Sequence, residues 1–259
     1  MQFLRFVPEL ARRGGRVVLE VMDGLQGLAS RMPGVAAVVR GAAPPAFDTH
    51  VALMSLPHKL ALSRLPAGAP YLRARDALAW QWGDRLAASG HRPGRELAVG
   101  LVWAGNAALR NSRERSPGFD VVRPLLHLPG TRFFSLQKGA GCAELVGRPL
   151  PANFIDLDRE IASFDDTAAI IANLDVVVTC DTAVAHLAGA LGKPTFAMLP
   201  HTPDWRYGLD PHASAWYPAM RLFRQSTRGD WTNVSSRVTR ALEEAVASLP
   251  SQVLAAAHA

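Results

Sequence analysis

Apolar residues along the chain follow two alternating patterns: short runs rich in β-branched residues, and longer stretches with apolar residues at helical spacing. The runs at 97–103 and 176–179 contain almost no polar residue, which is typical of strands buried on both faces. We predict further strands at 131–136, 153–156 and 195–199, and helices at 77–89, 120–127, 166–173, 183–191 and 232–249. This alternation predicts an α/β fold with a parallel sheet and crossover helices.

A smaller set of elements precedes this region. We predict helices at 3–13 and 24–31, strands at 16–21, 35–40 and 46–53, and a short helix after Pro57. The segment Pro66-Ala67-Gly68-Ala69-Pro70 is typical of a boundary between units. We therefore expect a partial N-terminal unit at 1–75, a C-terminal unit at 76–250 and a flexible tail at 251–259.

Composition narrows the class of protein. Hydrophobic residues make up 49% of the 259 residues, which is enough for a large core and excludes a disordered chain. No apolar run approaches the roughly 20 residues that span a membrane. Arg5, Pro8 and Glu9 interrupt the first segment, so it is a poor signal peptide. Two cysteines without metal-ligand spacing indicate a reducing, cytoplasmic compartment.

The formal net charge is +6, and the cations are mostly arginines scattered along the chain. No dense basic block and no nucleic-acid-binding motif is present, so we expect no nucleic-acid partner. The basic balance favours a phosphate-bearing ligand, with peripheral contact to an anionic membrane surface as a further expectation. The alternative is that the arginines reflect only the base composition of a GC-rich genome.

The best-marked candidate site follows the strand at 176–179 and reads Cys180-Asp181-Thr182-Ala183-Val184-Ala185-His186. A buried strand ends there at a polar turn, and a helix of small residues begins. Ligands bind outside the carboxyl ends of strands in open α/β sheets, and free N–H groups at a helix N-terminus suit phosphate. We therefore predict that Asp181, Thr182, Ala183 and His186 bind a diphosphate. The alternative is structural, with Asp181 or Thr182 capping the helix and His186 as an interior polar residue.

Two more loops at the same predicted edge carry cations. Gln137 and Lys138 follow the strand at 131–136, and a lysine there can neutralise a phosphate as a point charge. The spacing is not that of a Walker A motif. The loop after the strand at 97–103 carries Asn106, Arg113 and Arg115, whose guanidinium groups can pair with phosphate oxygens. The alternative for each cation is a solvated or ion-paired side chain.

A fourth loop follows the strand at 195–199 and carries Asp204 and Trp205. Aromatic side chains in such a loop can stack on a base or a sugar, although more often they pack the loop against the domain. The convergence of all four features on one edge of one sheet favours a shared binding site.

These segments together make the chain resemble glycosyltransferase family 9, the heptosyltransferase-like group. The resemblance is closest to the glycosyltransferase domain that bacterial tetratricopeptide-repeat proteins often carry at their C-terminus. Each matching segment is weak alone, but their order along nearly the whole chain is specific. They are Phe47-Asp48-Thr49-His50, Met54-Ser55-Leu56-Pro57, Pro70-Tyr71-Leu72, Gly100-Leu101-Val102-Trp103-Ala104-Gly105-Asn106, Ser135-Leu136-Gln137-Lys138-Gly139, Asp166-Thr167-Ala168-Ala169, the run from Asp181 to Pro194, Asp204-Trp205-Arg206, Trp216-Tyr217-Pro218 and Leu222-Phe223-Arg224-Gln225.

The resemblance implies a GT-B fold, in which two Rossmann-like domains face a cleft. It also implies a metal-independent glycosyltransferase without a further cofactor, which moves a sugar from a nucleotide diphospho-sugar to a saccharide, lipid-linked or protein acceptor. The donor diphosphate would lie near Thr182, with Lys138 and Arg113 or Arg115 supplying positive charge. A general base on the N-terminal domain would activate the acceptor, and Asp48 and His50 are the candidates.

One departure from the family pattern concerns the N-terminal domain. Such domains open with a strand and a glycine-rich, Gly-Asp-containing loop, whereas this chain begins with residues typical of the helix that follows. We therefore expect an incomplete N-terminal domain, through a misassigned start, a fragment or lost activity. Two alternatives to the transferase remain: a nucleotide-sugar-binding module without turnover, and a GT-B-fold nucleotide-sugar epimerase.

Overall fold

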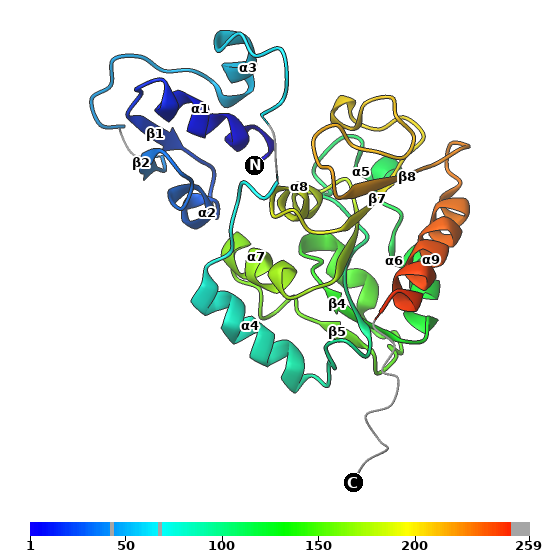
Figure 1. Ribbon diagram of the computed structural model, residues 1–259. Helices are drawn as coiled ribbons and strands as arrows, with labels where there is room; N and C mark the ends of the chain where they lie inside the picture. Colours follow the sequence, from blue (N-terminus) through cyan, green and yellow to red (C-terminus); the bar gives the residue numbers. More distant parts are fainter. Residues whose placement is uncertain (42–43, 67–68, 250–259) are drawn as a thin grey trace.

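The computed structural model describes residues 1–41, 44–66 and 69–249. The predicted tail at 251–259 and the middle of the predicted boundary at 66–70 lie outside the described residues. Two separate parallel sheets are present, a small one formed before residue 40 and a large one formed after residue 96 (Figure 1). The predicted division between two units falls between these sheets.

The large sheet has the strand order β5-β4-β3-β6-β7-β8, and every neighbouring pair is parallel. Its two central strands are buried along their whole length, as their apolar sequences predict. The strands are β3 (Leu97–Val102), β4 (Thr131–Ser135), β5 (Phe154–Asp156), β6 (Val176–Cys180), β7 (Thr195–Leu199) and β8 (Met220–Arg224).

The prediction missed strand β8. Its apolar run is interrupted by Arg221, which is exposed, and it ends at Arg224. A strand at the edge of a sheet need not be buried on both faces, so its sequence lacks the continuous apolar run of β3 and β6.

Helices cover both faces of the large sheet (Figure 1). Alternate residues of β3 face the two layers: Ala98 and Val102 belong to one core, and Val99 and Leu101 to the other. The first core packs under α4 (Asp76–Ala88), α7 (Phe164–Ala172) and α8 (Ala183–Ala190), and the second under α6 (Phe119–Val122), η3 (Arg123–His127) and α9 (Trp231–Ala247). Three short helices lie in the connecting loops: α5 (Ser112–Arg115), η4 (Gly139–Leu145) and η5 (Trp205–Tyr207).

The N-terminal unit contains a two-stranded parallel sheet of β1 (Val17–Glu20) and β2 (Val35–Val39). Its helices are η1 (Gln2–Phe6), α1 (Val7–Arg12), α2 (Gln26–Ser30), η2 (Leu53–Ser55) and α3 (Leu56–Lys59). The predicted helix at 3–13 is therefore a 3₁₀ turn followed by an α-helix with Pro8 in its first turn. The predicted strand at 46–53 is wrong. Phe47 and Val51 in that segment are exposed, so the segment has no apolar face to bury against a neighbouring strand.

The two units share one continuous core. Leu4 and Val7 belong to the same cluster of buried residues as Ile170 and Leu187 of the large unit. Helix α2 contacts α7, and η1 contacts α8. An ion pair between Arg31 and Asp165 links the end of α2 to α7. The N-terminal unit is therefore held beside α8, at the edge of the sheet where the predicted site lies.

Candidate functional site

The strand order places a switch point between β3 and β6. The chain leaves β3 toward β4 on one side, whereas β6 continues to β7 and β8 on the other. Connections that leave adjacent strands in opposite directions open a crevice outside their carboxyl ends, where ligands of open α/β sheets bind. In this chain such a crevice is expected between the loop after β3, residues 103–118, and the turn from β6 into α8, and this position is called the crevice below.

The N-terminus of α8 opens into this crevice without a side-chain cap. Thr182 is the N-cap residue, with an extended backbone, but its hydroxyl lies 3.0 Å from the Thr179 hydroxyl instead of bonding to the helix. Ala183, the first helical residue, is exposed. The first N–H groups of α8 are thus available to an anion. The alternative in which Thr182 or Asp181 caps the helix is not what the structure shows.

Asp181 is buried at the end of β6 and joins two loops. Its Oδ1 accepts a hydrogen bond from the Tyr207 hydroxyl at 2.9 Å, and its Oδ2 lies 3.3 Å from Nη1 of Arg115. Arg115 comes from α5 in the loop after β3, and its Nε is buried without a hydrogen-bond partner among the described residues. A Cβ at Gly105 would lie 3.3 Å from the guanidinium, so glycine allows the arginine to lie against its own loop. Arg115 is therefore ion-paired with Asp181 at the start of α8, and its Nε is a donor without a partner among the described residues.

His186 lies one turn into α8, on the side of Tyr207 and Tyr217. Its Nδ1 is 3.1 Å from the Tyr217 hydroxyl, and its ring stacks on that of Tyr207, with centroids 6.2 Å apart and planes 20° apart. Burial lowers the pKa of His186 to about 4, although the neighbouring Asp181 carboxylate acts in the opposite direction. The imidazole is therefore neutral near pH 7 and can donate only one N–H.

Gln137 lies in the crevice wall but has no free hydrogen-bonding group. Its Oε1 accepts from the backbone N–H groups of Trp103 and Ala104, and its Nε2 donates to the carbonyls of Ala104 and Lys138. The side chain is buried and bridges the loops after β3 and β4. Its position supports a structural role in holding those loops together.

Lys138 is half-exposed and ion-paired. Its Nζ lies 2.8 Å from Oδ1 of Asp158 and donates to the carbonyl of the same residue at 2.5 Å. The hydrogen bond from its ammonium holds the pKa of the Asp158 carboxyl below its ordinary value. To bind a phosphate, Lys138 would have to exchange this partner, and its role as a donor contact stays a prediction.

The other predicted residues of the C-terminal unit lie in its loops. Asn106 forms a turn, because its Oδ1 accepts from the Ala108 N–H at 3.0 Å. Asp204 caps η5 through the Arg206 N–H and pairs with the Arg206 guanidinium at 2.7 Å. Trp205 is 58% exposed and contacts Phe3 of the N-terminal unit, with ring centroids 6.4 Å apart. Trp205 thus packs its loop against the other unit.

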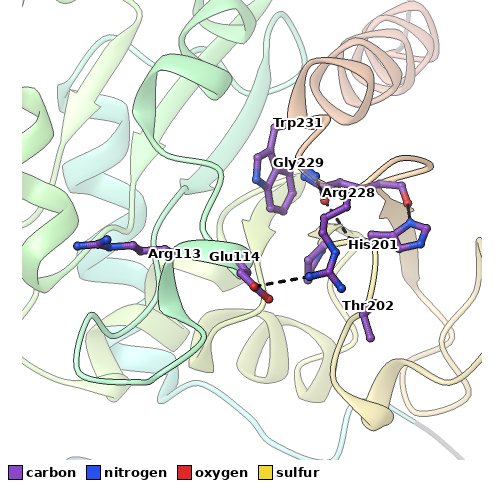
Figure 2. Close-up of a pocket in the computed structure, with 9 residues that line it drawn as sticks. Arg113, Glu114, His201, Thr202, Arg228, Gly229 and Trp231 are labelled. Carbon is purple, nitrogen blue, oxygen red and sulfur yellow. Dashed lines mark hydrogen bonds and ion pairs between the residues drawn. The ribbon is translucent and has the colours of Figure 1, made fainter.

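Arg113 borders a different cavity, of about 130 Å³, next to the start of α9 (Figure 2). Glu114 and Arg228 face each other across this cavity at 3.8 Å, while the Arg113 side chain points away from His201 and Thr202 (Figure 2). The α5 helix therefore directs Arg113 and Arg115 differently, and of these two arginines it is Arg115 that contacts Asp181, at 3.3 Å.

The acceptor-side candidates lie on the N-terminal unit. Asp48 and His50 are exposed in the segment before η2, and the His50 ring contacts that of Phe47 at 5.7 Å. Their role as bases stays a prediction. Tyr207, which holds Asp181, was not predicted, whereas Tyr217 lies in the segment Trp216-Tyr217-Pro218 of the family resemblance, but its contact with His186 was not predicted. The only signal for Tyr207 was its position in the aromatic loop after β7.

The strand order, the switch point and the uncapped α8 give an α/β protein whose candidate site lies at the carboxyl edge of its C-terminal sheet. Two solved structures share the fold along nearly the whole chain. E. coli ADP-heptose lipopolysaccharide heptosyltransferase II is 13% identical, with a TM-score of 0.62 and 95% of each chain covered. A family 9 glycosyl transferase from Veillonella parvula DSM 2008 is 10% identical, with a TM-score of 0.63 and 95% of this chain and 94% of that chain covered. The expected GT-B fold is confirmed.

Sequence comparison points to the same group of proteins. Residues 161–229 match the model of Glycosyltransferase family 9 (heptosyltransferase). Protein FlbA of Caulobacter vibrioides is 33% identical over 187 residues, which cover 69% of this chain and 30% of FlbA. The match thus spans less than a third of the length of this curated relative. The segment at 161–229 contains β6, α8 and the loop with both tyrosines, so the family match coincides with one wall of the crevice.

Proposed function

We propose that this chain is a metal-independent glycosyltransferase of family 9 that binds the diphosphate of a nucleotide diphospho-sugar at the N-terminus of α8. The observation that carries this proposal is the uncapped start of α8 beside Arg115, at the switch point of the sheet. In acyl- and glycosyl-transfer chemistry alike, fixed dipoles and cations stabilise the charge that develops on a leaving group. The backbone N–H groups of α8, Arg115 and the neutral His186 would take that role for the leaving nucleotide.

The proposed acceptor is a saccharide, free, lipid-linked or attached to a protein, and it is bound on the N-terminal unit. Residues 1–75 contain ten Lys and Arg against four Asp and Glu, whereas residues 76–259 contain eighteen of each. The whole formal charge of +6 therefore belongs to the N-terminal unit, which favours an acceptor with anionic groups or a nearby anionic membrane surface. Asp48 and His50 are the proposed bases. No helix among the described residues is long and apolar enough to cross a bilayer, and we propose a cytoplasmic reaction.

Titration with ADP, UDP and GDP, followed by calorimetry and thermal shift, tests the donor site. ADP is the first probe because one structural relative is named as an ADP-heptose lipopolysaccharide heptosyltransferase. Arg115→Ala should weaken nucleotide binding about 10- to 150-fold, the equivalent of about 1.5–3 kcal/mol for a charged hydrogen bond. Arg113→Ala is the matched control, since its side chain is exposed and makes no contact with Asp181 among the described residues, and it should leave binding within 2-fold. Equal effects of the two substitutions would reject the site.

Turnover separates the transferase from its alternatives. Incubation with nucleotide sugars and anionic saccharide acceptors should release nucleoside diphosphate only when acceptor is present. Binding without release would instead establish a nucleotide-sugar-binding module. Conversion of the sugar nucleotide without any acceptor would establish an epimerase. A protein carrying upstream sequence, including any tetratricopeptide repeats, is the control for activity that depends on a longer chain.

A further inference from the structure

Tyr217 is built into the back of α8. It is 2% exposed, and a Cβ at Gly189 would lie 2.4 Å from its ring. A glycine at this position of the helix therefore lets the phenol ring lie directly on the helix backbone. Tyr217 belongs to the loop between η5 and β8, and the seat on Gly189 fixes its hydroxyl one turn away, beside His186.

Only one proton can lie between the Tyr217 hydroxyl oxygen and Nδ1 of His186. Nδ1 of His186 and Oη of Tyr217 are 3.1 Å apart, so one of the two atoms donates. A buried phenol proton without an acceptor costs about 1–3 kcal/mol, whereas Nε2–H can be satisfied at the half-buried side of the ring by water or a ligand. Donation from Tyr217 to Nδ1 satisfies both groups, and it leaves the only proton of the neutral imidazole on Nε2.

Tyr71 is the competing acceptor for the Tyr217 proton. Burial raises the pKa of Tyr217, and the nearby Tyr71 hydroxyl raises it further. The Tyr71 hydroxyl donates to the carbonyl of Gln2 at 3.4 Å, and its oxygen can still accept a second hydrogen bond. Nδ1 of His186 is the acceptor that lies at 3.1 Å from the Tyr217 hydroxyl, and a Tyr71→Phe variant decides between the two acceptors.

Tyr207 completes the positioning of the ring. The Tyr207 ring stacks on the His186 imidazole, and Tyr207 is itself held by the hydrogen bond from its hydroxyl to Asp181. The His186 ring is therefore fixed in plane by Tyr207 and in rotation by Tyr217, and both tyrosines are almost fully buried.

We propose that Tyr217 is a positioning residue that holds His186 as the Nε2–H tautomer, so that the imidazole presents a hydrogen-bond donor to the donor diphosphate at α8. The ligand half of this inference rests on the proposed function, whereas the tautomer half stands on the geometry alone. Tyr217 does not touch the diphosphate and acts only through His186.

The tautomer is measured without any ligand by long-range ¹H–¹⁵N NMR of protein carrying ¹⁵N-histidine at neutral pH. His186→Gln identifies the signals of His186 among the eight histidines. The wild-type protein should show an unprotonated Nδ1 and a protonated Nε2. Tyr217→Phe removes only the hydroxyl and keeps the ring on Gly189, and it should give a mixture of both tautomers. A protonated Nδ1 in the wild type, or an unchanged pattern in Tyr217→Phe, would overturn the inference.

Tyr71→Phe is the matched control, since it removes a second buried hydroxyl from the same cluster. It should leave the tautomer of His186 unchanged; a shift as large as that of Tyr217→Phe would mean that Tyr217 donates to Tyr71, and the inference would fail. Thermal unfolding of both variants shows whether the fold is intact. If Tyr217→Phe does not fold, Tyr71→Phe and the wild-type pattern still decide which atom donates.

Inorganic pyrophosphate is the probe for the ligand half, because it contains the diphosphate without base or sugar. Its dissociation constant should rise about 2- to 10-fold in Tyr217→Phe, as expected for a partly lost hydrogen bond, and stay unchanged in Tyr71→Phe. Equal affinity of Tyr217→Phe and wild type would overturn the ligand half. Failure of the wild type to bind pyrophosphate would overturn the proposed function, and the NMR pattern would still judge Tyr217 by itself.

Discussion

Substitution of Gln137 by leucine separates the two roles considered for this residue. If Gln137 bridges the loops after β3 and β4, as its four hydrogen bonds indicate, leucine leaves two backbone N–H groups and two carbonyl interactions without partners. Each bond contributes about 0.5–1.5 kcal/mol, so we expect a loss of about 2–6 kcal/mol in the free energy of unfolding. Leucine has nearly the volume of glutamine, so a cavity adds little to this loss.

Chemical denaturation and thermal unfolding give the measurement. For a protein of this size, 1 kcal/mol corresponds to a shift of about 2–4 °C, so Tm should fall by roughly 4–24 °C. Gln81→Leu, at an exposed position of α4, is the control and should change stability by less than about 0.5 kcal/mol. Nucleotide affinity, measured well below Tm, reports the other role. Wild-type stability combined with lost nucleotide binding in Gln137→Leu would refute the bridging role and favour direct contact with the donor.

Two further predictions concern the back of α8. In Gly189→Ala, helix propensity favours alanine by about 1 kcal/mol, but a Cβ 2.4 Å from the Tyr217 ring forces a rearrangement that typically costs about 1–3 kcal/mol. Thermal unfolding should therefore show a lower Tm. A more stable variant would contradict the packing of Tyr217 on Gly189. Burial lowers the pKa of His186 to about 4, below its ordinary value of 6.5. Between these pKa values the unfolded chain binds more protons than the folded chain. The stabilising contribution of His186 is therefore complete above pH 6.5 and is lost as the pH falls toward 4. Denaturation of His186→Gln should show a smaller loss of stability than the wild type over that range.

The elements of the C-terminal unit could be predicted because their physics is local. Strands buried on both faces are nearly pure apolar runs, and helices that cover a sheet repeat their apolar residues every three or four positions. Both signals fail at the margins of a sheet. Strand β8 contains two arginines because one of its sides is an edge, and the segment at 46–53 is exposed except for Leu53, which packs against the core in η2.

The proposed location of the site rests on the same local signals, but the contacts within it could not be predicted from them. Asp181 was predicted as a donor contact, and the sequence contains no trace of its bonds to Arg115 and Tyr207, which lie 66 and 26 positions away. Those contacts depend on the conformation of two loops, which no periodic pattern encodes. Gln137 shows that a sequence can also suggest a ligand contact that the structure explains otherwise. A polar residue in a loop at the carboxyl end of a strand suggests a ligand contact, but the partners of Gln137 are backbone groups of its own and the neighbouring loop.

Only one wall of the crevice lies in the segment that matches the family model, and this bears on the specificity for nucleotide and acceptor. The matched segment at 161–229 supplies the α8 N-terminus, Asp181, His186 and Tyr217. These groups suit any diphosphate, because backbone N–H groups and an imidazole do not distinguish one base or sugar from another. The remaining walls, the loop with Arg115 and the basic N-terminal unit, come from outside that segment. Under the proposed function, these walls contribute to the choice of nucleotide and acceptor. Exchange of residues 103–111 between relatives, which keeps Arg115, should therefore alter nucleotide preference while leaving pyrophosphate affinity largely unchanged.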